Sequence, residues 1–420
     1  MKITGLITEY NPFHNGHLYH LQKAKELTDA DAIIVVMSGD YVQRGEPAVM
    51  PKYLRTQAAL EAGASVVLEL PVCYATGSAE YFARGAIALL DSLGCVDAVC
   101  FGSECGDIEI LENIAEVFLE EPERYRVALQ EYLKEGKSFP VAREQAFLRY
   151  WNETEENLDK YEEVLKNPNN ILGIEYIKAM KLKKSRMKAC TIQRIVAGYH
   201  DENLANVDSK EKISSASAIR KSILAEDTCE SVQKHVPENA MYLYEKYYKK
   251  RYPVMLDDFS LLLKYRLLSE DRESLKRYAD MSDELAGRIL NHLDDYRTVT
   301  GFCEKLKTRE MTYTRISRSL LHVLLNITSQ EMEEYKRMGD CFYARILGFQ
   351  KEQTEILGIM KRKSRVPLVT KISRADKALD AYGQRMLQKE IFASNLYESV
   401  LVEKYDAEYQ NEYRKQIIRN

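Results

Sequence analysis

The stretch Thr8-Glu9-Tyr10-Asn11-Pro12-Phe13-His14-Asn15-Gly16-His17 directly follows an apolar run at residues 2–8 and begins a helical pattern at Gly16. A glycine at a strand-to-helix turn lets the backbone approach a phosphate, and the first turn of the helix offers free N–H groups. Two imidazoles flanking that glycine can donate hydrogen bonds to phosphate oxygens as charge builds in a transition state. The pattern therefore predicts a site for attack on an α-phosphate. The alternative is that His14 and His17 only cap the helix.

Outward from this stretch, the first 120 residues alternate apolar runs typical of strands with longer amphipathic segments typical of helices. This order predicts an α/β fold with a parallel sheet that is covered on both faces. Ligands are then expected at the carboxyl ends of the strands. The predicted strands lie at about 2–8, 32–38, 65–70 and 97–102, and the helices lie at 16–27, from Pro51, at 78–93 and at 107–119.

The rest of the chain is predicted to be mainly helical. Residues 120–170 are charged and helical, a strand at 189–196 returns to the sheet, and a loop leads into a helix at 213–224. Beyond these segments the pattern is almost purely helical to the end. We place the domain boundary so that a nucleotide domain occupies 1–235, with a helical insertion near 120–170, and a helical domain occupies 236–420.

Composition limits the classes of function. The chain has 60 Lys and Arg against 64 Asp and Glu, a formal net charge of −4, so any RNA site must be a local patch. No apolar run approaches the roughly 18 residues that span a bilayer, and no signal peptide is recognisable. The eight cysteines form no CxxC pair, which argues against a zinc site or a disulfide framework. We expect a cytoplasmic protein that contacts neither a membrane nor DNA.

Several further strings accompany the first one. They are Ser38-Gly39-Asp40-Tyr41-Val42-Gln43-Arg44-Gly45-Glu46-Pro47-Ala48, Glu69-Leu70-Pro71, Phe101-Gly102-Ser103-Glu104, Asn167-Pro168-Asn169-Asn170-Ile171-Leu172-Gly173 and Thr312-Tyr313-Thr314-Arg315. Together they make the chain resemble the bacterial tRNA(Met) cytidine acetate ligase family of the HxGH nucleotidyltransferase superfamily, over most of its length. The resemblance implies a Rossmann-like HxGH nucleotidyltransferase domain with a parallel sheet, followed by a mostly α-helical C-terminal RNA-binding domain.

The resemblance also implies an activity. Members of this family use ATP to ligate acetate to N4 of the wobble cytidine of elongator tRNA(Met), through an acetyl-adenylate, which gives N4-acetylcytidine. Mg²⁺ is expected to accompany ATP and to be held mainly by the phosphates. His17 and His20 lie at i, i+3 spacing, but no further ligand cluster supports a metal pair, so no protein metal ligands are predicted.

A second superfamily element is expected late in the nucleotide domain, and Ile213-Ser214-Ser215-Ala216-Ser217-Ala218-Ile219-Arg220 fits it. Its hydroxyls can bond to phosphate oxygens, and Arg220 can balance the triphosphate charge. One extra residue before Arg220 leaves the roles of Ser215 and Ser217 open, and a plain helix N-cap is the alternative. The predicted catalytic residues are His14, His17, Ser217 and Arg220.

The remaining nucleotide contacts follow from the same resemblance. Gly102 ends a strand where an adenine or ribose would need space, Asn169 and Asn170 precede a helix, and Arg194 could meet a phosphate. The alternatives are a turn glycine, an N-cap and a surface arginine. The predicted ATP-binding residues are Ile7, Thr8, Glu9, Tyr10, Asn11, Pro12, Phe13, His14, Asn15, Gly16, His17, His20, Gly102, Asn169, Asn170 and Arg194.

Two groups of residues are predicted to bind the other substrates. Asp40, Gln43 and Arg44 follow the second strand and are expected to face the crevice, where they would hold acetate or contact RNA, unless the loop is simply solvated. For tRNA, a positive window contains Lys361, Arg362, Lys363 and Arg365, and Tyr313 with Arg315 could stack on or contact an unpaired base. A solvated helix face is the alternative for each basic patch.

Two other functions remain possible from the sequence. One is a small-molecule adenylyltransferase, and the other is a nucleotide-sensing RNA-binding module without turnover. ATP consumption with acetate, in the presence and absence of tRNA, separates these alternatives from the ligase.

Overall fold

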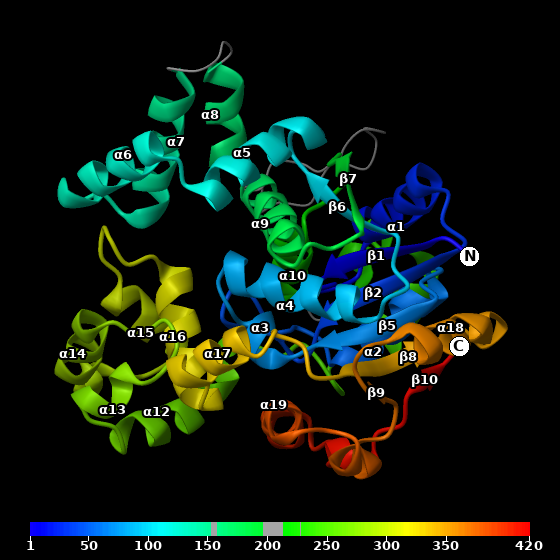
Figure 1. The fold of residues 1–420 in the computed structure, drawn as a ribbon. Helices are drawn as coiled ribbons and strands as arrows, with labels where there is room; N and C mark the ends of the chain where they lie inside the picture. The colour runs from blue at the N-terminus through cyan, green and yellow to red at the C-terminus, as the bar shows by residue number, and fades with distance from the viewer. Residues whose placement is uncertain (153–157, 196–212, 227) are drawn as a thin grey trace.

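The computed structural model of the protein describes residues 1–420 except 153–157, 196–212 and 227 (Figure 1). An eight-stranded sheet lies at its centre, in the order β10-β8-β5-β2-β1-β6-β7, with β9 paired to β8. All of its strand pairs are parallel except β5 with β8. The strands of this sheet are β1 (Ile3–Thr8), β2 (Ala32–Ser38), β5 (Val66–Leu70), β6 (Ala98–Ser103), β7 (Lys188–Gln193), β8 (Ala344–Phe349), β9 (Leu368–Val369) and β10 (Ile418–Arg419).

The four N-terminal strands confirm the predicted apolar runs, and their alternation creates two cores. Ile34 and Val36 of β2 belong to the core under α4, α5 and α9, whereas Ile33 and Val35 belong to the core under α1 and α2. A parallel sheet must be buried on both faces in this way. The helices of this half are α1 (Asn15–Thr28), α2 (Lys52–Glu61), α3 (Val72–Ala75), α4 (Ala79–Ser92), α5 (Ile108–Glu120), α9 (Pro168–Leu182) and α10 (Ala216–Ala225).

The predicted insertion is helical and forms a separate group beside α5 and α9, coloured cyan to teal in Figure 1. Phe147, Trp151 and Tyr161 pack together at its centre, with ring centroids 4.6–5.7 Å apart. A small hairpin of β3 (Tyr41–Val42) and β4 (Glu46–Pro47) follows β2 and becomes part of the site described below. The insertion consists of α6 (Glu123–Lys134), α7 (Phe139–Asn152) and α8 (Leu158–Lys166).

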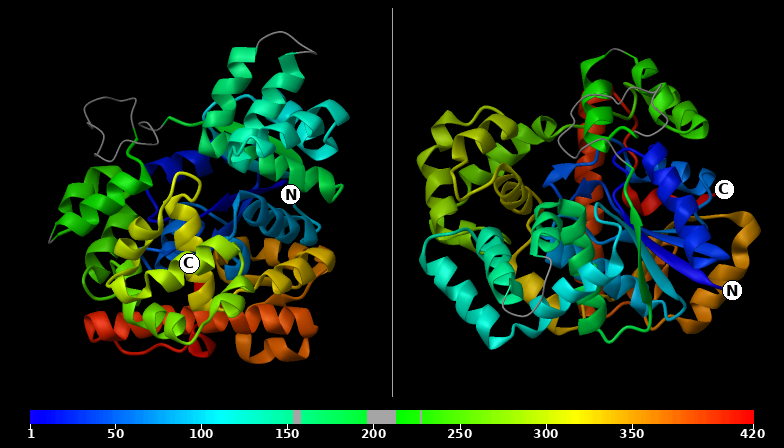
Figure 2. Two further views of the ribbon diagram at one scale, coloured as in Figure 1. Left: turned by 90° about the vertical axis from the view of Figure 1, so that its left-hand side faces the viewer. Right: turned by 90° about the horizontal axis from the view of Figure 1, so that it is seen from above.

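The C-terminal half is mostly helical, as predicted. The two views in Figure 2 show its yellow-green helices grouped beside the nucleotide half, with the long α19 lying along the base of the left view. Its helices are α11 (Glu238–Tyr247), α12 (Ser260–Leu268), α13 (Arg272–Lys276), α14 (Asp283–Asn291), α15 (Val299–Leu306), α16 (Tyr313–Leu325), α17 (Ser329–Arg337), α18 (Thr354–Lys363) and α19 (Ala381–Tyr405). Short 3₁₀ turns are η1 (Glu230–His235), η2 (Leu256–Phe259), η3 (Leu293–Asp295), η4 (Lys351–Gln353), η5 (Ile372–Lys377) and η6 (Glu412–Arg414).

One expectation about this half is wrong. The chain is not almost purely helical after residue 236, because β8 returns to the central sheet and pairs antiparallel with β5. The final residues do the same, since β10 adds to β8 in parallel. The C-terminal half therefore supplies one edge of the central sheet, while the division near residue 235 stays a prediction.

None of the described helices combines the length with the apolar character needed to cross a bilayer. The cytoplasmic location stays a prediction.

Candidate active site

The carboxyl ends of the central strands open into a cavity of about 810 Å³. Its wall comes from the ends of β1 and β6, from the β3–β4 hairpin, and from α1, α4, α9, α10 and α16. The cavity therefore lies where a parallel sheet is expected to bind ligands. The predicted residues that line it are Ile7, Thr8, Glu9, His14, Gly16, His17, His20, Gln43, Arg44, Gly102, Asn169, Arg194, Ser217 and Arg220.

His14 and His17 form a reciprocal cap at the start of α1. The Gly16 N–H donates to His14 Nδ1 at 3.0 Å, and the His14 N–H donates to His17 Nδ1 at 3.3 Å. Because each Nδ1 accepts a hydrogen bond, the ring proton of each imidazole is assigned to Nε2. The capping alternative is thus correct in structure, and it is compatible with the chemical role, since on this assignment the cap uses neither Nε2–H.

The same turn shows why glycine stands between the two histidines. A Cβ on Gly16 would lie 2.7 Å from Cε1 of His14, so any larger residue would displace the ring. The two rings lie 3.9 Å apart, centroid to centroid. Burial lowers the pKa of His14 to about 3 and the pKa of His17 well below its usual value. Both imidazoles are therefore neutral at neutral pH.

Arg220 and Ser217 lie in the first two turns of α10 and line the same cavity. Arg220 Nη1 donates to the backbone oxygen of Asn11 at 2.7 Å, and its Nη2 lies 3.4 Å from Ser217 Oγ. Ser215 Oγ instead accepts the Ala218 N–H at 3.1 Å as the N-cap of α10. The structure thus pairs Ser217, rather than Ser215, with Arg220, although both serines line the cavity.

Glu9 is an acidic group in this otherwise basic wall. Its Oε1 accepts the Gln43 N–H at 2.9 Å, which ties the end of β1 to the β3–β4 hairpin. Burial raises the pKa of Glu9, while that hydrogen bond and the charges of Arg220 and Arg44 act in the opposite direction. Gln43 and Arg44 therefore reach the cavity wall as predicted.

Gly102, Asn169 and Arg194 meet on the β6 side of the cavity. A Cβ on Gly102 would lie 3.2 Å from Cγ of Arg194, so the glycine keeps this side open next to the arginine stem. Asn169 Nδ2 donates to Glu104 Oε1 at 2.6 Å, which holds the amide at the cavity edge. The binding of adenosine on this side stays a prediction.

Comparison with known proteins agrees with this geometry. A sequence profile described as HIGH Nucleotidyl Transferase matches residues 1–413. A tRNA(Met) cytidine acetate ligase of Acetivibrio thermocellus is 41% identical over 401 residues, covering 94% of each chain. One from Thermoanaerobacter sp. is 43% identical over 398 residues, covering 94% of this chain and 95% of that one. The chain belongs to the tRNA(Met) cytidine acetate ligase family.

Solved structures of the ligase family show the same fold. Thermotoga maritima TmcAL in its apo form superposes with a TM-score of 0.93 at 34% identity, covering 100% of this chain and 99% of that one. A second crystal structure of the same protein, bound with alpha-thio ATP, gives a TM-score of 0.90 at 34% identity and covers 100% of both chains. The predicted family and α/β fold are therefore confirmed.

Some predicted ATP-binding residues of this ligase-family chain support the cavity without lining it. Asn11 Oδ1 accepts the Val49 N–H at 2.8 Å, Tyr244 Oη donates to the Phe13 backbone oxygen at 2.6 Å, and Asn15 Nδ2 donates to the Lys234 oxygen at 3.0 Å. These contacts hold the loop before α1 from several sides. The residues of this kind are Tyr10, Asn11, Pro12, Phe13 and Asn15.

Asn170 also lies outside the cavity wall, contrary to the prediction. Its Oδ1 accepts the N–H groups of Glu104 and Cys105 at 2.8 and 3.1 Å, and its Nδ2 donates to the Val164 oxygen at 3.1 Å. The residue is 1% exposed, and these three hydrogen bonds tie the loop after β6 to the end of α8. Asn169, its neighbour, is the residue that lines the cavity.

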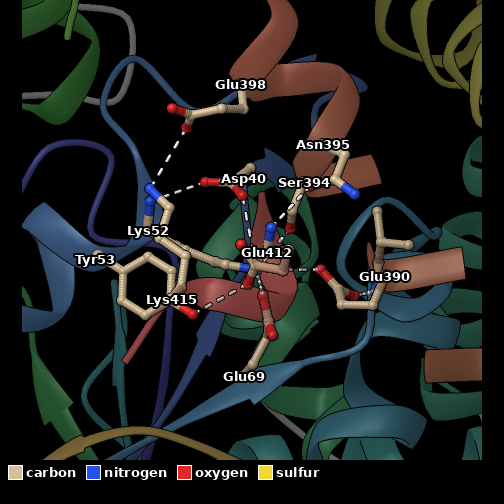
Figure 3. Close-up of polar contacts among 12 residues, drawn as sticks. Asp40, Lys52, Tyr53, Glu69, Glu390, Ser394, Asn395, Glu398, Glu412 and Lys415 are labelled. Carbon is tan, nitrogen blue, oxygen red and sulfur yellow. Dashed lines mark hydrogen bonds and ion pairs between the residues drawn. The ribbon is translucent and has the colours of Figure 1, made fainter. Parts of the chain in front are cut away.

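Asp40 does not lie where it was predicted to bind acetate or RNA. It was expected to face the crevice, but it turns inward and its Oδ1 accepts the Lys52 N–H at 2.8 Å (Figure 3). Lys52 Nζ lies 2.6 Å from Glu69 and 2.8 Å from Glu412 in the same buried group. A buried ammonium must be surrounded by carboxylates, which explains why Asp40 is drawn inward. We call this group the Lys52 cluster: Asp40, Lys52, Glu69, Arg345, Glu390 and Glu412.

The helix α16 adds residues to the cavity wall that the sequence did not single out, while the contact of Tyr313 and Arg315 with RNA stays a prediction. Thr314 and Arg318, one turn apart, line the cavity, whereas Tyr313 and Arg315 do not. Tyr313 is half-buried against the core, and Arg315 is exposed at the first turn of the helix. The string 312–315 lies at the start of the helix that lines the cavity, but Arg318 lies beyond that string. Its place four residues after Thr314, on the same face of the helix, is the signal that could have identified it.

The positive window lies at the other end of the sheet. Arg365 is paired with Asp91 near the end of α4, and α4 begins with Ala79 in the cavity wall. The twelve residues between Ala79 and Asp91 correspond to about 18 Å of helix. A contact of Lys361, Arg362, Lys363 or Arg365 with RNA would therefore be distant from the reacting nucleotide, and it stays a prediction.

Proposed function

We propose that this protein uses ATP to ligate acetate to N4 of the wobble cytidine of elongator tRNA(Met). The observation that carries the proposal is the pair of neutral Nε2–H donors of His14 and His17 at the floor of a cavity with arginines in its wall. The relatives named tRNA(Met) cytidine acetate ligase, at about 40% identity over 94% of the chain, support the choice of substrates.

In the first step, a carboxylate oxygen of acetate attacks the α-phosphorus of ATP in line with the departing pyrophosphate. A P–O bond to acetate forms, the P–O bond to the β-phosphate breaks, and acetyl-adenylate and pyrophosphate result. No general base is needed, because acetate is already ionised at neutral pH. Charge builds on the α-phosphate oxygens, and hydrogen bonds from His14 and His17 stabilise it there.

The negative charge of the departing pyrophosphate must also be stabilised. Arg220 and Ser217 at the start of α10 supply a guanidinium, a hydroxyl and the free N–H groups of a helix N-terminus. We also propose that Mg²⁺ accompanies ATP and is held mainly by its phosphates. The described residues contain no group of three His, Cys, Asp or Glu side chains placed to hold a metal, and no step here depends on the ion.

In the second step, the N4 amine of cytidine attacks the acetyl carbonyl of acetyl-adenylate. An amide C–N bond forms, the bond from the carbonyl carbon to the AMP oxygen breaks, and N4 loses one proton. Because the helical half contributes α16 to the cavity wall, an RNA bound to that half would be held beside the activated acetyl group.

The test is mass spectrometry of nucleosides after incubation with ATP, acetate and total tRNA. N4-acetylcytidine in tRNA(Met), with release of AMP and pyrophosphate, is the expected result. Acetyl-adenylate without any RNA product would favour a small-molecule adenylyltransferase, and ATP binding without turnover would favour a sensing module. Acetylation from acetyl-coenzyme A without ATP would overturn the proposal.

A further inference from the structure

One part of the cavity wall comes from neither of the two phosphate-binding elements. Thr314 and Arg318 of α16 line it together with Ala79 and Phe82 of α4. The predicted phosphate-binding residues lie elsewhere, His14 and His17 at the start of α1 and Ser217 and Arg220 on α10. The residues of α4 and α16 are therefore a separate part of the wall. An in-line displacement needs its nucleophile on the side of the α-phosphate away from pyrophosphate. The face made by α4 and α16 is therefore the candidate place for the acid.

Among the described residues, the guanidinium of Arg318 is hydrogen-bonded through Nε alone. Its Nε donates to Asp280 Oδ2 at 3.0 Å, and its side chain is 16% exposed. Outside the gaps at 153–157, 196–212 and 227, no hydrogen-bond partner is found for its two terminal nitrogens. A largely buried guanidinium whose two terminal NH₂ groups are unused is costly unless a ligand completes it. That fork matches the two oxygens of a carboxylate.

The backbone of Arg318 is locked against the β3–β4 hairpin. Ser317 Oγ donates to the Gly45 oxygen at 2.7 Å. Gly45 has a φ of +76°, and a Cβ there would overlap the Arg318 backbone, so the hairpin tip and α16 are in direct contact. Arg44 reaches the same cavity from this hairpin. Arg318 thus projects from a rigid junction rather than from a free helix face.

An apolar surface lines the same cavity as this guanidinium. His322, one turn beyond Arg318, has its Nε2 3.1 Å from the Thr76 backbone oxygen, and α4 begins just after Thr76. Ala79 and Phe82 lie one turn apart at the start of α4, and Phe82 is only 2% exposed. A small acid would find a cation for its carboxylate and an apolar surface for its alkyl group at the junction of the two helices.

The other arginines in the wall have different neighbours. Arg220 is bonded to the Asn11 oxygen and to Ser217, beside the predicted pyrophosphate. Arg194 packs against Gly102 on the predicted adenosine side. Arg318 lines the cavity one turn before His322, whose Nε2 lies 3.1 Å from the Thr76 oxygen just ahead of α4.

We propose that Arg318 binds the carboxylate of the acid substrate, that Asp280 positions its guanidinium, and that Phe82 limits the length of the alkyl chain. The inference rests on the proposed function, because it assigns the acid site of that reaction. The acid is a short monocarboxylate, because Arg318 offers one guanidinium and α4 offers a small apolar surface.

Acetate-dependent exchange of pyrophosphate into ATP, without tRNA, tests this assignment. Arg318→Ala should raise the KM for acetate by roughly 10- to 100-fold while the KM for ATP changes by less than about twofold, because one charge-assisted fork is removed. Arg318→Lys keeps the charge without the fork and should give a smaller rise. Asp280→Asn should raise the acetate KM without abolishing exchange at saturating acetate.

Arg315→Ala is the matched control. Arg315 is an exposed arginine on the first turn of the same helix and does not line the cavity, so its removal should leave the acetate KM unchanged. An unchanged acetate KM in Arg318→Ala and Arg318→Lys, or a rise in the ATP KM instead, would overturn the subsite. An inactive wild-type protein would instead refute the proposed function.

A second variant gives a readout that a structural defect would not produce. Phe82→Ala should raise kcat/KM for propionate or butyrate relative to acetate by about tenfold or more, since one methylene in an apolar pocket is worth a factor of roughly 10 to 200. A general loss of folding would lower all three values together. An unchanged ratio in a folded variant would remove Phe82 from the acid site.

Discussion

Replacement of Lys52 by methionine tests the buried network that joins the C-terminal half to the nucleotide half. Lys52 is 1% exposed and its Nζ lies 2.6 Å from Glu69, 2.8 Å from Glu412, 3.7 Å from Asp40 and 3.9 Å from Glu390. Although burial disfavours its charge, Glu412 and Glu69 raise the pKa of Lys52 well above its usual value. Methionine has a similar shape and removes the charge without opening a large cavity.

The loss of stability can be estimated from these contacts. Removing Lys52 leaves Arg345 as the cation paired with Glu69 and Glu412. Removing one partner of a buried ion pair costs about 3–5 kcal/mol. An unfolding entropy of about 2.1 cal/mol/K per residue gives about 0.9 kcal/mol/K for this chain. The melting temperature of Lys52→Met should therefore fall by about 3–6 °C.

Thermal unfolding followed by circular dichroism measures the effect, with Lys23→Met as the matched control. Lys23 forms an equally short ion pair with Glu26, 2.6 Å, but the two side chains are 47% and 64% exposed. Such a surface pair contributes about 0.3–0.5 kcal/mol, so the control should change the melting temperature by less than about 1 °C. A decrease in Lys52→Met no larger than that of the control would refute the reasoning.

A double variant sharpens the test. In Lys52→Met/Glu69→Gln, a carboxylate that has lost its ammonium is also neutralised; Arg345 loses its pair with Glu69 but keeps its pair with Glu412. The double variant should be less destabilised than the sum of the two single changes, because the residues are in direct contact. Additive effects would mean that the Lys52 charge does not interact with Glu69.

Three further predictions follow from the cavity and its surroundings. His14→Ala should lower the rate of acetyl-adenylate formation by about 10²–10³ with a much smaller change in ATP affinity, measured by pyrophosphate exchange and calorimetry, and unchanged turnover would contradict the role of the imidazole. Burial lowers the pKa of His14 to about 3 in the folded protein, whereas the unfolded chain keeps the usual value of 6.5. As pH falls below 6.5, the unfolded chain binds a proton that the folded protein does not, so ATP-free protein should lose stability. Between pH 7 and pH 5 urea titrations should show a His14 contribution of roughly 2 kcal/mol that is absent in His14→Gln, and equal pH dependence in both proteins would refute it. Replacement of Lys361, Arg362, Lys363 and Arg365 together by alanine should weaken tRNA binding and leave acetyl-adenylate formation unchanged. The slope of the salt dependence should fall by about one for each phosphate that the protein no longer neutralises. Unchanged tRNA binding would place the RNA site elsewhere.

The N-terminal strands were predictable because their signal is local. Each is an uninterrupted apolar run followed by turn residues, and the observed bounds of β1 and β2 differ from the predicted ones by at most one residue. The strand β8 was missed for the opposite reason. Its residues Ala344–Phe349 stand among helices, and only their pairing with β5, nearly 280 positions earlier in the chain, makes them a strand.

Asp40 and Asn170 illustrate the same limit within the site. Both stand in strings that point correctly to the cavity, next to residues that do line it. The direction of each side chain depends on partners elsewhere: Lys52 draws Asp40 inward, and the N–H groups after β6 hold Asn170. A motif identifies the turn on which a residue lies, but not which of two neighbours faces the ligand.

The sequence by itself determined the fold class and the phosphate site. His14, Gly16 and His17 lie within one turn of a helix that follows a strand, so their mutual geometry depends on local backbone conformation alone. Only the tertiary structure decided which residues complete the acid side and hold the two halves together. Ser317, next to Arg318, meets Gly45 of the hairpin across 272 positions, and Lys52 meets Ser394 across 342. Such pairs are brought together by burial of the two cores, and no local pattern in the chain records which distant side chains that burial will make neighbours.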